Sequence, residues 1–315
     1  MNSTYQQPAA DDARRMHASR EELAERIARA VPEDGPIHPM DGLRLHRATA
    51  PTELGHGVSY PALCVIARGS KETRVGNRTY RYDADHYLVA TAALPYATQI
   101  TEASKERPYL ALVLRLDPLV VGSVMVETGQ PAPRGSFGTP AFAVSPLDAD
   151  VLDATLRIVR LLDTPADQRI LLPLITREIV YRLLVGEQGG LVRHLATLGG
   201  ETNRIASAIE RLRAEFDQPI RIDALAQELG MSVSGFHHHF KQATAMSPLQ
   251  FQKQLRLQEA RRLMLSEDFD ATTAGLRVGY DDTSHFSREY KRLFGEPPLR
   301  DIARLRNASP GSAPM

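Results

Sequence analysis

Two stretches near the C-terminus carry polar and basic side chains at similar spacing. One set is Ser234, His237, His238 and Lys241, and the other is Thr283, Ser284, Ser287, Arg288 and Lys291. Serine, threonine, histidine and arginine can hydrogen-bond base edges or phosphates, and lysine neutralises phosphates. These residue types therefore predict a surface that binds double-stranded DNA.

The two sets belong to a sequence repeat with an offset of 50 residues. The aromatic and basic positions recur in step, and so does the proline after each set: Phe236 with Phe286, Phe240 with Tyr290, Lys241 with Lys291, and Pro248 with Pro298. Each copy has the pattern of a short helix, a glycine turn and a second helix, which is typical of a helix-turn-helix unit. The chain is therefore expected to present two recognition helices.

Small residues and glycines indicate how each unit folds. Ala226 and Gly275 are the small residues where the first helix packs on the second. Gly230 and Gly279 lie at the turns, because glycine adopts positive φ at little cost. Aromatic residues four positions apart give each second helix one buried face, which leaves its other faces free to enter a major groove.

A continuous helix is predicted over residues 251–265, between the two units, and Asp281-Asp282 is predicted to cap the second recognition helix. A rigid linker of this kind would hold the two recognition helices in adjacent major-groove segments, about 34 Å apart for one turn of DNA.

The histidine run and the local charge each have a second interpretation. His237-His238-His239 suggests a metal site, but consecutive helical positions diverge by about 100°, so the three imidazoles cannot converge on one ion. Basic residues outnumber acids over residues 237–262 and 288–306. A solvated helix face would explain such clusters equally well, and they favour DNA only because they fall on or just after the predicted recognition helices.

Length and composition limit the class of protein. The chain has 315 residues, a formal net charge of zero and a single cysteine, Cys64. These values allow two domains and exclude an intrachain disulfide and a multi-cysteine zinc site. The polar N-terminus lacks a signal-peptide core, and no apolar run is long enough to span a membrane. We expect a cytoplasmic protein without a cofactor or a membrane partner.

Residues 1–19 are expected to be disordered, and Ser19 is expected to cap a helix that ends before Pro32. After it, the N-terminal half has the pattern of a small β-barrel or sandwich followed by helices. Seven short runs are predicted to be strands, and Gly76-Asn77 is predicted to form a hairpin turn between two of them. The spacing of apolar residues changes to that of helices near Asp117, and Gly199-Gly200 marks a boundary. The predicted class is α+β: residues 1–200 form a β-barrel with a helical connector, residues 201–306 an all-α domain with tandem helix-turn-helix units, and residues 307–315 a flexible tail.

With these motifs in place, the chain resembles the AraC/XylS family of bacterial transcription regulators. The resemblance covers residues 202–306 and includes the closing segment Phe294-Gly295-Glu296-Pro297-Pro298-Leu299-Arg300. The chain departs from the family pattern at Gly275, at Leu299 with Arg300-Asp301 in place of the usual aromatic-arginine ending, and in its histidine-rich first recognition helix. The resemblance implies base or backbone contacts from Ser234, His237, His238, Thr283, Ser284, Ser287 and Arg288, while Lys241 and Lys291 are expected at phosphates.

Three N-terminal segments also resemble the cupin-like effector domain of one subgroup of this family. They are residues 59–66, 82–88 and 106–112. The resemblance implies regulation by a small-molecule effector and a partnership with RNA polymerase, with activation as the expected effect, although the residues do not fix whether transcription rises or falls. The change caused by the effector is expected to reach the DNA-binding half through the helices of residues 147–198. A homodimer through Leu156, Val159 and Leu162 is an alternative to packing of those residues within one chain.

Other classes of function remain open at this stage. A metal-dependent cupin enzyme would need an H-x-H pattern, which residues 1–200 lack. An alkylation-response protein would need several acceptor cysteines. Cys64 has two interpretations: a buried core thiol, or an exposed sensor of electrophiles or redox state near Arg68, and it is the candidate effector-site residue.

Overall fold

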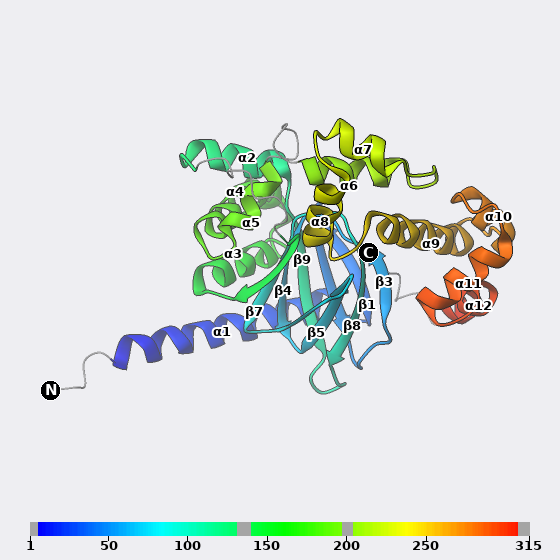
Figure 1. Cartoon of the computed structure of the whole chain (residues 1–315). Coiled ribbons are helices and arrows are strands. Elements are labelled where there is room, and N and C mark those ends of the chain that lie inside the picture. The colour runs from blue at the N-terminus through cyan, green and yellow to red at the C-terminus, as the bar shows by residue number, and fades with distance from the viewer. Residues whose placement is uncertain (1–5, 131–139, 197–203, 308–315) are drawn as a thin grey trace.

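The computed structural model describes residues 6–130, 140–196 and 204–307. Two antiparallel sheets face each other at the centre of the molecule, and helices cover one side and one end of them (Figure 1). One sheet has six strands in the order β1-β2-β9-β4-β7-β10, and the other has four in the order β3-β8-β5-β6. The mixed fold, with a sheet-rich N-terminal part and a helical C-terminal part, confirms the predicted α+β class.

The strand bounds agree closely with the predicted runs. The strands are β1 (Gly35–Met40), β2 (Leu43–Ala48), β3 (Gly55–Val58), β4 (Ala62–Arg68), β5 (Ser70–Val75), β6 (Arg78–Asp83), β7 (His86–Ala90), β8 (Pro95–Glu102), β9 (Tyr109–Arg115) and β10 (Phe142–Pro146). Gly76, with φ +58°, forms the predicted hairpin turn between β5 and β6. Strands β1, β3 and β10 were not predicted from the sequence.

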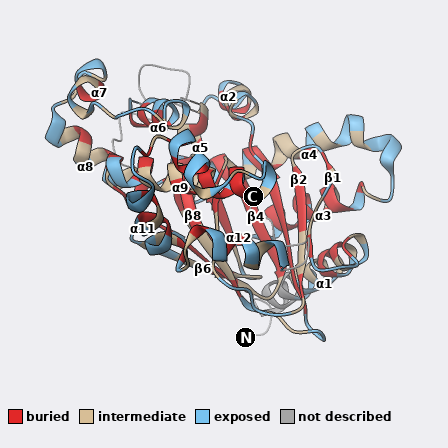
Figure 2. Ribbon diagram, turned by 90° about the vertical axis from the view of Figure 1, so that its right-hand side faces the viewer, coloured by how far each residue is buried: buried red, intermediate tan, exposed pale blue. Residues whose placement is uncertain are grey.

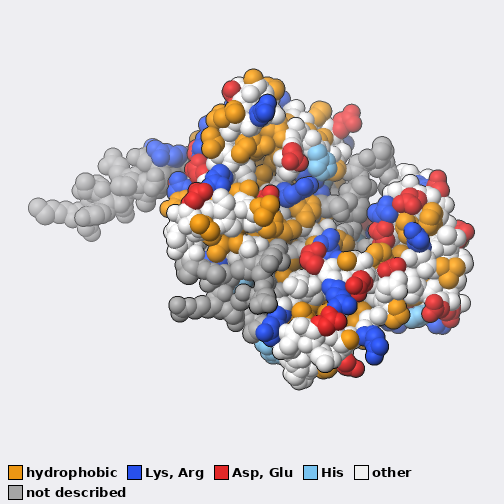
Figure 3. Space-filling view, turned by 90° about the horizontal axis from the view of Figure 1, so that it is seen from above, with side chains coloured by type: hydrophobic (Ala, Val, Ile, Leu, Met, Phe, Trp, Pro, Cys, Tyr) orange, Lys and Arg blue, Asp and Glu red, His pale blue; other side chains and the backbone are white. Residues whose placement is uncertain are grey.

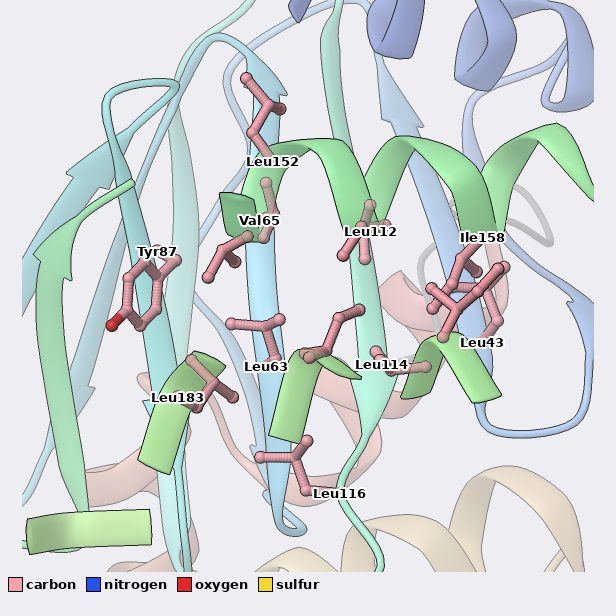
Figure 4. Packing of buried hydrophobic residues seen from close by; sticks show 14 of the residues in the cluster. Leu43, Leu63, Val65, Tyr87, Leu112, Leu114, Leu116, Leu152, Ile158 and Leu183 are labelled. Carbon is pink, nitrogen blue, oxygen red and sulfur yellow. The ribbon is translucent and has the colours of Figure 1, made fainter. Parts of the chain in front are cut away.

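The outward face of the six-stranded sheet is apolar. Alternate residues of a strand point to opposite faces, so Leu43, Leu63, Leu112 and Leu114 lie together on this face. They pack against helices that cross the sheet, with Leu152 and Ile158 among their partners (Figure 4). Figure 2 shows the strands in the middle of this sheet, such as β4, as mostly buried, whereas the covering helices keep exposed sides.

The covering helices come from both ends of the N-terminal part. They are α1 (Gln6–Ala30), α2 (Pro118–Glu127), α3 (Ala149–Arg160), α4 (Pro165–Val185) and α5 (Gly189–Ala196). Residues 1–19 were expected to be disordered, with a helix starting at Ser19; instead α1 begins at Gln6, so Ser19 lies inside the helix. Leu156 and Val159, named above as dimer candidates, are each 1% exposed and pack within the chain.

The C-terminal part is helical. Its helices are α6 (Arg204–Ala214), α7 (Ile222–Glu228), α8 (Val233–Thr244), α9 (Pro248–Ser266), α10 (Ala271–Arg277), α11 (Thr283–Phe294) and α12 (Pro298–Asn307). The predicted boundary at Gly199-Gly200 and the residues after Asn307 lie outside the described residues. Asn307 itself, placed in the tail above, is the last residue of α12. In the described chain, no helix is long and apolar enough to cross a membrane.

Both helix-turn-helix units contact the barrel directly. The core around Phe236 and Phe240 is continuous with residues that line the inside of the barrel. Where the first unit meets the barrel, the backbone N–H of Ala141 donates to the carbonyl of Ala243 at 3.2 Å. A side chain at Gly76 would meet the carbonyl of Ala245, since a Cβ there would lie 2.3 Å from that oxygen. The barrel and the first unit are therefore in close contact without a spacer.

The second unit touches the barrel at a different place. His56 of β3 packs edge-on against Phe294 at 5.0 Å between ring centroids, and Glu53 forms an ion pair with Arg304 at 2.7 Å. Burial lowers the pKa of His56 to about 4, so this ring is neutral near pH 7.

Candidate nucleic-acid interface

Helix α8 is the first predicted recognition helix, and its cap and core positions fix which side chains face outward. Ser232 caps the helix by accepting a hydrogen bond from the N–H of Gly235 at 3.1 Å. Phe236 and Phe240 are fully buried, with ring centroids 5.5 Å apart. Of the predicted DNA-binding residues on α8, Ser234, His238 and Lys241 are exposed and His237 is half-buried.

Helix α11 repeats this arrangement. Asp282 caps it by accepting hydrogen bonds from the N–H groups of Ser284 and His285 at 2.6 and 3.1 Å, and these bonds lower the pKa of Asp282. The prediction of a cap in Asp281-Asp282 is thus confirmed for Asp282. Phe286 and Tyr290 are fully buried. Of the predicted DNA-binding residues on α11, Thr283, Ser284, Arg288 and Lys291 are exposed and Ser287 is half-buried.

The turn glycines hold each pair of helices together as predicted. Gly230 and Gly279 have φ values of +60° and +86°. A Cβ at Gly279 would lie 2.1 Å from the carbonyl oxygen of Asp217, so the backbone approaches too closely for any side chain. A Cβ at Gly275 would lie 3.1 Å from the Phe286 ring. Gly279 therefore requires glycine, whereas at Gly275 a Cβ would be a tight contact that the Phe286 ring must move slightly to accept.

Most basic residues of the two predicted clusters are engaged inside the protein. Arg261 is buried and forms two hydrogen bonds to Asp301, at 2.8 and 2.7 Å. Glu289 forms ion pairs with Lys253 and Arg292, and Arg262 forms one with Glu259. Arg304 and Arg306 also have acidic partners. Charge counted along the sequence therefore overstates the charge available to DNA.

Four cations from the two clusters remain unpaired in the described residues. They are Lys241, Arg288, Lys291 and Arg300, and all are exposed. The first three are on the outer faces of the recognition helices, where we expected contacts to DNA. An exposed cation without an internal partner can neutralise a phosphate or bind a guanine without first breaking an ion pair.

Arg256 on linker helix α9 braces the two units. Its guanidinium donates to the carbonyls of Phe216, Asp217 and Gly279 at 2.7 to 3.0 Å. These carbonyls belong to the segment after α6 and to the turn between α10 and α11. The linker helix predicted over residues 251–265 is confirmed, and α9 contacts helices of both units.

A hollow of about 440 Å³ lies where the two units meet the barrel. Lys241, Lys253 and Arg292 line it, together with Gly76 and Asn77 at the tip of the β5–β6 hairpin. The hairpin tip thus lies beside Lys241, one of the predicted phosphate contacts.

Two exposed side chains near these faces were missed by the sequence analysis. His285 lies in the first turn of α11, and Arg277 lies at the end of α10. The Asp282 cap was a usable signal for His285, because the first turn after the cap of a recognition helix is the part that meets base edges. In the described residues no group of three or more histidine, cysteine or acidic side chains is placed to hold a metal ion.

Cys64 lies inside the barrel, as the core-thiol interpretation predicts. It is 6% exposed, and the hydroxyl of Tyr82 donates to its sulfur at 3.4 Å from the opposite sheet. Arg68 does not lie beside Cys64 in the barrel interior. An irregularity in the strand pairing between Ile66 and Arg68 shifts the register, and Arg68 forms an ion pair with Glu21 of α1.

Comparison with known proteins agrees with these two halves. The family model for the N-terminus of AraC-type transcriptional regulators matches residues 39–191, and a helix-turn-helix family model matches residues 225–304. The transcriptional activator RhaS of Salmonella schwarzengrund is 29% identical over 166 residues, which cover 51% of this chain. The matched segment spans only 58% of the length of that relative.

Two solved structures of ToxT from Vibrio cholerae share the fold. An apo variant has a TM-score of 0.53 at 10% identity and covers 86% of this chain and 99% of its own. The wild-type protein bound to an unsaturated fatty acid has a TM-score of 0.52 at 11% identity, covering 87% and 97%. At these identities the likeness concerns the arrangement of the chain alone.

Proposed function

Because the chain belongs to the AraC-type transcriptional regulators, we propose that it regulates transcription by sequence-specific binding to double-stranded DNA. The observation that carries this proposal is the pair of capped recognition helices whose outer faces hold Lys241, Arg288 and Lys291, none of which forms an ion pair within the described chain. Residues 1–200 would form the regulatory part, residues 201–306 the DNA-binding part, and residues 307–315 a tail.

The roles of the side chains follow from their chemistry. Arg288 would bind a guanine through two hydrogen bonds, and Lys241 and Lys291 would contact phosphates. Ser234, His237, His238, Thr283, Ser284 and Ser287 would contact base edges or the backbone. In the first turn of α11, His285 would join them.

We propose that a small-molecule effector binds the N-terminal barrel and changes DNA affinity. The fatty-acid-bound neighbour is an example of this fold with a small molecule, and barrels commonly provide such sites. From the sequence, the signal is expected to pass through the helices of residues 147–198. The contacts of the barrel with Ala245, Phe294 and Arg304 offer a shorter route, because a ligand that shifts the barrel moves both units directly.

Two protein partners are part of the proposal. RNA polymerase would be the partner through which the protein activates transcription, because the chain is similar to the transcriptional activator RhaS. A second copy of the chain would bind through the exposed apolar residues of α2 and α4. The residues of α3 first considered for this contact are buried within the chain. These residues are Leu119, Val126, Ile170, Leu174, Tyr181 and Val185. Apolar side chains are gathered over these helices, on the left of Figure 3.

We propose no catalytic activity and no cofactor, and a site of action in the cytoplasm, where the chromosome of a bacterium lies. The thiol of Cys64 is buried and accepts a hydrogen bond from Tyr82, so the sensor role for Cys64 is not favoured.

The proposal is tested by a purified fragment of residues 201–315 mixed with fragmented genomic DNA. Both units and their linker lie within this fragment, so it should shift a subset of the DNA, and the shift should weaken as salt rises. A folded fragment that shifts no DNA at low salt would rule the proposal out.

A further inference from the structure

The inward face of the barrel is unlike its outward face. On β2, Leu43 and Leu45 point outward into the apolar layer, whereas Arg44 and His46 point inward. On β5, Lys71 and Thr73 point inward. Three buried tyrosines share this interior with Cys64: Tyr82, Tyr96 and Tyr109. The space between the two sheets is therefore built with polar and charged groups that an apolar core would not need.

Two of these inward groups are cations without a counter-ion. Lys71 is 6% exposed and Arg44 is 7% exposed. Within the described chain neither forms an ion pair or a hydrogen bond, and Nε of Arg44 is fully buried without a partner. The acids on nearby strands point elsewhere: Glu72 pairs with Arg74 and Arg81. An uncompensated buried cation costs several kcal/mol, so folding alone does not account for two of them.

The charges of Arg44 and Lys71 act on each other and on His46 inside the barrel. Burial lowers the pKa of Lys71; the neighbouring Cys64 thiol acts in the opposite direction, and repulsion from Arg44 lowers the pKa. Burial also lowers the pKa of His46 to about 3, with added repulsion from Lys71 and Arg44. Burial raises the pKa of Tyr82 and Tyr109, so their hydroxyls stay protonated and can donate hydrogen bonds. The interior thus holds concentrated positive charge and neutral donors.

We propose that this interior is an anion-binding effector site in which Arg44 and Lys71 hold the carboxylate of a small organic acid. The inference rests on the proposed function, since it names the class of effector for the proposed regulatory domain. A guanidinium accepts a carboxylate in a bidentate pair, and an ammonium adds a point charge. Ile66, Leu88 and Val113 on the same face supply apolar contacts for the body of the acid.

The test measures binding of defined acids to the full-length protein. Straight-chain carboxylates from acetate to dodecanoate, and benzoate, are titrated by calorimetry beside the matching neutral amides and inorganic phosphate. We expect at least one carboxylate to bind and its amide to bind at least tenfold more weakly. Lys71→Met and Arg44→Met should each weaken that acid at least tenfold, while Lys105→Met, the same change on an exposed loop, should not.

Binding of no carboxylate, equal binding of acid and amide, or unchanged binding by both barrel variants would overturn the inference. Binding of inorganic phosphate in place of every organic acid would overturn the assignment to an organic acid.

A second readout needs no ligand. Lys71→Met replaces a buried unpaired cation with an apolar chain of similar length, so the ligand-free variant should melt at a higher temperature than the wild type. A lower melting temperature would show an internal partner for Lys71 and contradict the inference. DNA binding is measured on the same preparations: a wild type that binds DNA but no acid defeats only this inference, and one that binds an acid but no DNA defeats only the proposed function.

Discussion

At the scale of single residues, the availability of a charge matters more than its presence. Arg256, Arg261 and Arg262 are on the linker helix, yet all three bind groups of the protein itself. Arg288 and Lys291 are exposed one turn apart and form no ion pair within the described residues, although the charge of Arg288 acts on the cap Asp282. A sequence pattern cannot separate these two groups, because partners such as Asp301 arrive from another helix.

The free arginine on α11 should set sequence preference. Arg288→Ala is expected to lose about 1–3 kcal/mol of discrimination at one base pair, because the bidentate contact to guanine is lost. Lys241→Ala and Lys291→Ala should weaken binding to all sequences and lower the salt dependence by about one phosphate each. Binding-site selection and salt titrations measure both effects.

Arg262→Ala is the matched control, since its guanidinium already pairs with Glu259 and Glu267. An unchanged preferred site in Arg288→Ala would remove its assigned role.

The buried carboxylate of Asp301 should be critical for stability. It is fully buried and accepts hydrogen bonds from Arg261, Tyr290 and Arg304. Asp301→Ala leaves a buried guanidinium unpaired and is expected to lower the free energy of unfolding by roughly 3–5 kcal/mol. Asp153→Ala breaks an exposed pair with Arg157 on α3 and should cost under about 1 kcal/mol. Urea unfolding measures the loss of unfolding free energy in both variants. Equal losses would contradict the critical role of the Asp301 carboxylate.

At the scale of elements, local patterns predicted most of the fold. The strands with β-branched and aromatic residues, the two turn glycines and the linker helix all follow from spacing of residue types. The missed strands β1 and β3 contain glycine or proline, and they form because β2 and β8 offer them an edge to pair with. Helix α1 was missed over residues 6–18 because its polar N-terminal part lacks the apolar spacing that marks a helix.

The β5–β6 hairpin should control how the first unit sits on the barrel. Gly76→Ala puts a Cβ at positive φ and 2.3 Å from the carbonyl oxygen of Ala245. Gly129→Ala is the matched control, because Gly129 also has positive φ, +63°, but has open space around it. The control should lose about 1–2 kcal/mol from backbone strain alone.

Gly76→Ala should lose more stability than this control. It should also speed hydrogen exchange over residues 241–246, where the barrel contacts the end of α8. Equal effects of the two variants on stability and exchange would show that the hairpin contact does not hold the first unit in place.

At the scale of the whole molecule, the contact between the two halves was not predictable. The sequence led us to expect communication between the halves through the helices of residues 147–198. In the structure, residues on the β3 and β5–β6 side of the barrel reach α8, α11 and α12 directly. Such contacts depend on the shapes of two folded surfaces, and the spacing of residue types within one segment does not predict them. The inward cations Arg44 and Lys71 were missed for the same reason: their lack of partners appears only when two sheets close over them.

Footprinting of the full-length protein on a DNA site selected from genomic fragments tests the central claim most directly. Two recognition helices joined by one rigid linker helix should protect two major-groove segments on one face of the DNA, about one helical turn apart. Arg288→Ala should remove protection from one segment more than from the other. Protection of a single segment, or no protection of any selected site at low salt, would contradict the account.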